Sequence, residues 1–141
     1  MKNDCLSKIK GDKSYMKFIT QCVMNDWVVL EPIGDNDRYD CVIDRGFGFE
    51  RVQVKTGRYQ NGTVVFSNRS SHHHTRKGQS IGNSSKDYKN DVDAFGVYCH
   101  EIDKCYLVPI DDANYHEMRL RIAKPRNNNE ANINWAHKYE I

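Results

Sequence analysis

The sequence lacks the features that mark secreted, membrane-spanning and zinc-binding proteins. Its five cysteines show no C-x-x-C spacing, and their odd number leaves one thiol unpaired in any disulfide scheme. Residues 1–13 contain no apolar run typical of a signal peptide, and no stretch of the chain is apolar enough to span a bilayer. We therefore expect an intracellular protein of a cytoplasm, nucleoid or organelle stroma, with no membrane partner.

The chain also lacks internal repeats and any change in composition that would divide it into domains. Its 141 residues suffice for one hydrophobic core without disulfide or metal crosslinks. The apolar share of 38% and the charged share of 28% are ordinary for a globular protein, which excludes extensive disorder. We expect a single domain over residues 1–141, with Cys22, Cys41 and Cys99 as small core residues.

The net charge of +2 is low, but the cations are unevenly distributed. Residues 68–90 contain five lysines and arginines against one acid, and residues 118–129 contain four with no acid. Such clusters create a local positive field that attracts polyanions such as DNA. Each cluster taken alone is equally compatible with a solvated polar segment.

Hydrophobic periodicity predicts one helix and several strands. Tyr15, Phe18, Ile19, Cys22 and Val23 recur at the spacing of one helical face, which predicts a helix over residues 12–25, capped by Asp12 or Ser14. Strands are predicted over residues 27–30, 39–44, 49–56, 63–66, 92–99 and 105–110.

The remaining segments carry weaker signals. Residues 67–90 are polar and without periodicity, which predicts a long functional or disordered loop. Residues 113–118 are predicted to be helical, and a last helical turn is expected near Trp135. The order of these elements predicts a mixed α/β domain with one central sheet.

A group of polar residues falls on two neighbouring predicted strands. Side chains alternate along a strand, so Gln53 and Lys55 lie on one face while Val52 and Val54 lie on the other. A hairpin between the two strands can bring Asp40 beside this polar pair. A single Asp and a Gln-x-Lys also occur by chance in many sheets, so the spacing alone does not define a site.

These residue types fit metal-dependent hydrolysis of a phosphodiester. A hard cation such as Mg²⁺ prefers oxygen ligands, which Asp40 can supply from its carboxylate, Gln53 from its amide and Val54 from its carbonyl. The ion polarises a phosphoryl oxygen and lowers the pKa of a bound water. Lys55 can orient the attacking water and stabilise negative charge in the transition state.

The segment from Pro32 to Lys55 resembles the PD-(D/E)XK nucleases, in the branch found as group I intron homing endonucleases. Its most specific parts are Tyr39-Asp40 and Gln53-Val54-Lys55-Thr56. Asp40 matches the acidic metal ligand of the family, Gln53 takes the place of the usual Asp or Glu, and Lys55 matches the motif lysine. Supporting similarity lies in residues 93–98, 106–109 and 120–121, so the resemblance covers most of the chain.

The resemblance implies a restriction-endonuclease-like fold, with a central mixed sheet flanked by helices. It also implies a site-specific homing endonuclease that hydrolyses both strands of a long double-stranded DNA target with Mg²⁺ or another divalent cation such as Mn²⁺. The implied assembly is a homo-oligomer, either a dimer or a tetramer, which brings two catalytic centres to one target.

The first helix departs from the family pattern. The family carries a Glu there, facing the metal, whereas this sequence has Tyr15 at the matching position. A phenol is a poor Mg²⁺ ligand, because its pKa of about 10 keeps it protonated at neutral pH. Asp12, one helical turn earlier, is an alternative ligand. The sequence therefore predicts either a carboxylate-poor site with weak metal binding or an impaired enzyme.

The candidates for DNA contact are basic or polar residues outside this site. Three consecutive histidines, His72 to His74, match no standard zinc pattern and are better explained by a DNA-contacting or solvated loop. The full set of DNA-contact candidates is Arg58, Asn68, Arg69, Ser71, His72, His74, Arg76, Lys77, Arg119 and Arg121.

Two other functions remain open at this point. A structure-selective nuclease, such as a Holliday-junction resolvase, can be built on the same fold. A DNA-binding protein that has lost catalysis is the other, and Tyr15 is the residue that favours it.

Overall fold

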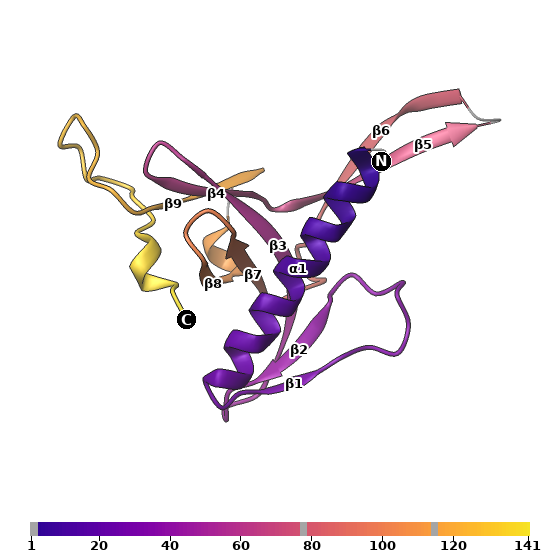
Figure 1. Cartoon of the computed structure of the whole chain (residues 1–141), viewed down its shortest axis with the longest axis horizontal. Coiled ribbons are helices and arrows are strands. Elements are labelled where there is room, and N and C mark those ends of the chain that lie inside the picture. Colours follow the sequence, from indigo (N-terminus) through magenta and orange to yellow (C-terminus); the bar gives the residue numbers. More distant parts are fainter. Residues whose placement is uncertain (1–2, 77–78, 114–115) are drawn as a thin grey trace.

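The computed structural model describes residues 3–76, 79–113 and 116–141. In these ranges one α-helix packs on a seven-stranded, mostly antiparallel sheet, and a separate two-stranded hairpin projects from the domain (Figure 1). The elements are α1 (Asn3–Met24), β1 (Val28–Leu30), β2 (Cys41–Asp44), β3 (Phe49–Gln60), β4 (Thr63–Ser67), β5 (Arg69–Arg76), β6 (Gln79–Asp87), β7 (Ala94–Cys99), β8 (Lys104–Pro109), the 3₁₀ turn η1 (Ile110–Asp112), β9 (Glu117–Arg121) and the 3₁₀ turn η2 (Ala136–Lys138).

The helix α1 begins at Asn3, nine residues before the predicted start. Leu6 and Ile9 in its first half are exposed, so this half contacts little of the core and carries no buried stripe for periodicity to detect. In its second half Phe18 and Cys22 are fully buried, as expected, whereas Val23 is 56% exposed and was wrongly assigned to the buried face.

The strand β3 is the centre of the sheet. It pairs antiparallel with β2 over its first residues, parallel with β7 from Val52 to Gly57, and antiparallel with β4 at its end. The strand runs four residues past the predicted end at Thr56, because Asn61 and Gly62 form the turn into β4 with positive φ angles. One long strand therefore links both halves of the sheet.

The core consists of two clusters on opposite faces of the central strands. Val52 and Ala94 pack against Phe18 of the helix, whereas Phe95 and Val97 belong to the second cluster. The alternation of β3 and β7 side chains produces this division. The expected mixed α/β domain is confirmed, but the expectation that helices flank the sheet is wrong for the described residues. One helix covers the first cluster, and the second is closed by β4, β9 and the C-terminal segment.

Two predicted segments differ from the structure. Residues 69–76 and 79–87 pair as β5 and β6 rather than forming the predicted loop, and the polar sequence of these strands carries no hydrophobic alternation from which they could be predicted. Residues 113–118 do not form the predicted helix over their described part. Glu117–Arg121 is β9, in which Met118 and Leu120 are buried and alternate with Arg119 and Arg121. The helical turn expected near Trp135 is confirmed as η2.

The described helices include none that is long and apolar enough to cross a membrane.

The five cysteines are free, and four of them are buried, including the three predicted core thiols. Burial raises the pKa of Cys22 and of Cys41 to about 12, and that of Cys99 and of Cys105 to about 11. A thiol reagent reacts with the thiolate, which these four residues scarcely form at pH 8.

We expect one thiol, that of exposed Cys5, to react rapidly with a thiol reagent in the folded protein. The other four should react only after unfolding in guanidinium chloride. Counting released chromophore with Ellman's reagent measures this. Cys5→Ser should remove the rapid phase, and a second rapid thiol in that variant would contradict the burial of the core cysteines.

Candidate functional site

Asp40 lies directly before β2 and is fixed against β3. Its backbone N–H donates to the carbonyl of Val52 at 2.9 Å, and its carboxylate accepts the backbone N–H of Val54 at 2.8 Å. The pairing of Cys41 with Val52 places Asp40 opposite Gln53. The chain thus holds this carboxylate at the middle of the longest strand.

Burial raises the pKa of the Asp40 carboxyl above its ordinary value. The Val54 N–H, the Lys55 ammonium and the Gln53 amide oppose this effect without cancelling it. Because these partners do not fully offset the cost of burying the charge, a nearby cation would further stabilise the ionised carboxylate. The structure places Gln53 and Lys55 close enough to Asp40 to act on its carboxyl group.

Lys55 lies on the face of β3 opposite Val54. Its ammonium donates to the Arg69 carbonyl at 3.0 Å and to the Tyr88 hydroxyl at 3.3 Å, and lies 4.6 Å from the Tyr88 ring centroid. Burial lowers the pKa of Lys55 to about 8, against the opposing effect of the Asp40 charge. The side chain is therefore still mostly protonated at pH 7, as a charge-stabilising group requires.

Arg38 connects the site to the β5–β6 hairpin and was not predicted from the sequence. Its guanidinium donates to the Asp91 carboxylate at 3.2 Å, to the Ser70 hydroxyl at 2.8 Å and to the Asp87 carbonyl, and lies 4.1 Å from the Tyr88 ring centroid. The two ends of the hairpin are thus held beside Lys55. These contacts join residues far apart in sequence, and no local pattern indicates them.

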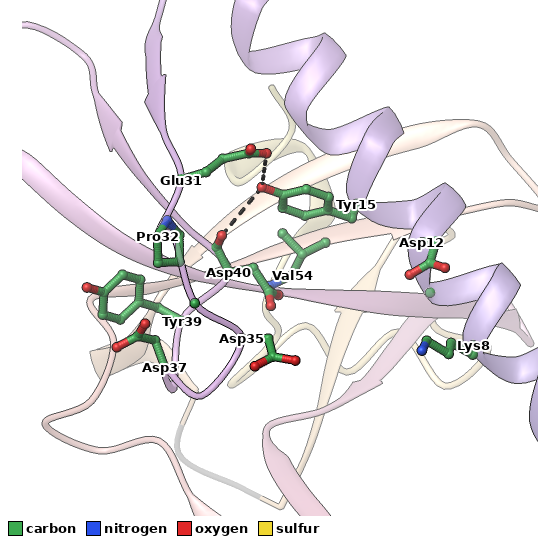
Figure 2. A pocket seen from close by; sticks show the side chains of 12 residues that line it. Lys8, Asp12, Tyr15, Glu31, Pro32, Asp35, Asp37, Tyr39, Asp40 and Val54 are labelled. Carbon is green, nitrogen blue, oxygen red and sulfur yellow. Dashed lines mark hydrogen bonds between the residues drawn. The ribbon is translucent and has the colours of Figure 1, made fainter.

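A cavity of about 550 Å³ opens beside Asp40, between α1 and the segment that follows β1 (Figure 2). Five carboxylates line it, against the single ammonium of Lys8. The lining acids are Asp12, Glu31, Asp35, Asp37 and Asp40. A cavity with this excess of negative charge attracts cations and repels a bare phosphate.

Tyr15 faces this cavity from the helix, as the family position implies. Its hydroxyl donates to the Glu31 carboxylate at 2.6 Å and lies 3.4 Å from the Asp40 backbone carbonyl (Figure 2). Burial, together with the hydrogen bond to Glu31, raises the pKa of Tyr15 well above its ordinary range. The phenol is therefore neutral. Asp12 lines the same cavity one turn earlier.

Glu31 is a site residue that sequence reasoning missed. It follows β1, whose Leu30 pairs with Val42, so the next position along lies beside Cys41 and hence close to Asp40. In the sequence, Glu31 is marked only by its position directly after a short predicted strand. That position indicates proximity to Asp40 only once the pairing register of β1 and β2 is known.

The residues present fit a divalent cation. Mg²⁺ in proteins is bound by one or two carboxylates and neutral oxygens and keeps several waters. Asp40 would supply a carboxylate to such an ion, and Gln53 and Val54 would supply an amide oxygen and a backbone carbonyl. Within residues 3–76, 79–113 and 116–141, no three His, Cys, Asp or Glu side chains are grouped so as to hold an ion. The site therefore suits a partly hydrated ion rather than a fully enclosed one.

The DNA-contact candidates fall into three groups. Asn68 donates to the Ala113 carbonyl and Arg121 to the Thr63 hydroxyl, so these two side chains support the fold. Arg58 and Arg119 are exposed, and both form ion pairs with Glu117. The third group belongs to the hairpin. Its β5 strand contains Arg69, Ser71, His72, His74 and Arg76, while Lys77 lies outside the described residues.

Comparison with known proteins agrees with this geometry. A solved structure of a bacterial homing endonuclease, I-Ssp6803I, is similar with a TM-score of 0.72 and 27% sequence identity, over 94% of this chain and 87% of that chain. No curated protein sequence matches the chain. The family model for PD-(D/E)XK endonucleases matches residues 5–141. The chain therefore belongs to the PD-(D/E)XK endonuclease family and is a phosphodiester hydrolase.

Proposed function

We propose that this protein is a site-specific homing endonuclease that hydrolyses both strands of a long double-stranded DNA target, using Mg²⁺ or Mn²⁺. The observation that carries this proposal is that the Asp40 carboxylate is held by the Val54 N–H of β3, next to Lys55 in the same strand, so that the two charges act on each other. The similarity over nearly the whole chain to a protein described as a homing endonuclease supports the finer assignment.

Each residue of the site has a separate role in this proposal. Asp40, Gln53 and the Val54 carbonyl would hold the divalent ion, which would supply positive charge next to the scissile phosphate and lower the pKa of a bound water. Lys55, mostly protonated at neutral pH, orients the attacking water and stabilises the charge that develops on the phosphoryl oxygens. Its Arg69 and Tyr88 partners fix the direction of the ammonium.

The β5–β6 hairpin is the proposed DNA-contacting arm. A two-stranded ribbon is narrow enough to enter the major groove of B-DNA. Its β5 strand carries Arg69, Ser71, His72, His74 and Arg76, and Lys77 follows it. Exposed Arg58 and Arg119 form ion pairs with Glu117 in the free protein. On binding, they are proposed to leave Glu117 and pair with DNA phosphates instead.

The proposed enzyme acts as a homo-oligomer, because one copy of the site cuts one strand. An apolar patch on the sheet face opposite α1 supports contact with a second copy. Val28 and Leu30 of the edge strand β1 are exposed there, together with Phe49 of β3. Burying such a patch between copies would remove apolar surface from water.

The proposal is tested by a cleavage selection on a library of random double-stranded DNA. With Mg²⁺ we expect enrichment of one long, near-palindromic sequence cut on both strands, and no cutting in chelator. Light scattering of the same sample should give a mass of at least two chains.

Two other results would overturn the proposal in different ways. Cutting of branched DNA without sequence preference would indicate a structure-selective nuclease. Sequence-specific binding in chelator, with no metal able to restore cutting, would indicate a DNA-binding protein without catalysis.

A further inference from the structure

We propose that Glu31 is a second carboxylate ligand of the divalent ion held by Asp40, and that Tyr15 is the residue that positions it. This inference rests on the proposed metal-dependent function. Glu31, in the segment after β1, would then supply the carboxylate that the family carries in its first helix, where this chain has Tyr15.

The Tyr15 hydroxyl donates to the Glu31 carboxylate at 2.6 Å and lies 3.4 Å from the backbone carbonyl of Asp40, so one phenol links the Glu31 side chain to the main chain at Asp40 (Figure 2). The β1–β2 register brings Glu31 beside the residue that follows Asp40. Glu31 and Asp40 thus lie at the same part of the cavity wall, fixed through a shared neighbour.

The Glu31 carboxylate keeps free capacity for a ligand. A carboxylate can accept about four hydrogen bonds or ligand contacts, and the Tyr15 hydroxyl donates only one proton to it. The hydrogen bond is made by Glu31 Oε1, which leaves the second oxygen for an ion. Carboxylates that ligate metals are usually oriented by such a neighbouring donor. The neutral Tyr15 phenol therefore orients the Glu31 carboxylate toward the ion without binding the ion itself.

Asp12, Asp35 and Asp37 line the same cavity as Asp40 and Glu31, with Lys8 as the ammonium in the lining. The resulting excess of negative charge attracts a cation into the cavity. Glu31 differs from Asp35 and Asp37 in being tied to a residue that also contacts Asp40. Two carboxylates with neutral oxygens and water match the ligand set that Mg²⁺ prefers.

The test is Mn²⁺ binding to the full chain without DNA, measured by electron paramagnetic resonance of the free ion. Glu31→Gln keeps the acceptor for Tyr15 but removes the charge, and we expect it to weaken Mn²⁺ binding by at least about tenfold. Asp35→Asn is the matched control, because it removes one carboxylate from the same cavity. We expect Asp35→Asn to weaken Mn²⁺ binding less than about threefold, because it only reduces the negative potential of the cavity and removes no ligand.

Tyr15→Phe tests the positioning role. It removes the hydroxyl but keeps the ring, so the melting temperature should change little, while Mn²⁺ affinity should fall in the same direction as in Glu31→Gln. Tyr15→Glu combined with Glu31→Gln should restore affinity, because it returns a carboxylate to the same part of the cavity.

Equal effects of Glu31→Gln and Asp35→Asn, or unchanged binding in Glu31→Gln, would overturn the proposal. Unchanged Mn²⁺ binding in Asp40→Asn would overturn it as well, since the ion would then lie elsewhere. The proposed nuclease function fails separately, if the wild-type protein binds Mn²⁺ but cuts no DNA with any metal.

Discussion

Asp40→Asn is expected to reduce DNA cleavage by about a thousandfold, equivalent to about 4 kcal/mol of transition-state stabilisation. Asparagine can still accept the Val54 N–H, which now bonds the Asp40 carboxylate at 2.8 Å, so the β2–β3 connection is kept. What is lost is the negative charge that the proposed ion requires. The loss should be measured as single-turnover cleavage of the selected target in Mg²⁺.

Lys55→Met provides the matched comparison. It keeps a chain of similar length beside the Tyr88 ring but removes the ammonium. Cleavage should fall to a similar extent, whereas Mn²⁺ binding should be retained in Lys55→Met and lost in Asp40→Asn. Cleavage within tenfold of wild type in either variant, with a normal circular dichroism spectrum, would contradict the proposed site.

Phe18→Ala is expected to destabilise the fold by about 3–5 kcal/mol, a large part of the stability of a small domain. Phe18 is fully buried between α1 and the sheet, where its ring lies directly over Gly96 of β7. Alanine leaves a cavity that neighbouring strands cannot fill without bending. Urea unfolding followed by circular dichroism measures the change in free energy.

Two variants separate this packing effect from helix propensity. Val23→Ala lies in the same helix at a residue 56% exposed and should change stability by less than about 0.5 kcal/mol. Gly96→Ala places a Cβ 2.6 Å from the Phe18 ring and should cost about 1–3 kcal/mol through overpacking. A Phe18→Ala effect no larger than that of Val23→Ala would show that the helix is not anchored at this position.

The strands around the site could be predicted from the sequence because their side chains alternate between a buried and a polar face. Val52 and Val54 pack toward the helix while Lys55 reaches Tyr88 on the other side, as the period of two requires. The assignments of Cys41 and Cys99 were confirmed for the same reason, since both lie inside such strands, and that of Cys22 because it lies on the buried face of α1.

The features that could not be predicted depend on contacts without a local pattern. The β5–β6 hairpin is polar along its sequence and is defined by backbone pairing. The first half of α1 carries exposed Leu6 and Ile9, so its helical state leaves no amphipathic signal. Glu31 lies near Asp40 because of the register between β1 and β2. Arg38 meets Asp91 because the chain returns to this part of the fold more than fifty residues later.

The way the hairpin is attached has a consequence for how this protein can diversify. Contacts that tie it to the domain lie at its two ends, where Ser70 and the Asp87 carbonyl meet Arg38 and the Arg69 carbonyl meets Lys55. The hairpin forms its own two-stranded sheet, separate from the seven strands of the domain (Figure 1). If the hairpin is the DNA-contacting arm that we propose, its sequence can therefore change between these two attachment points while the contacts with Arg38 and Lys55 are kept.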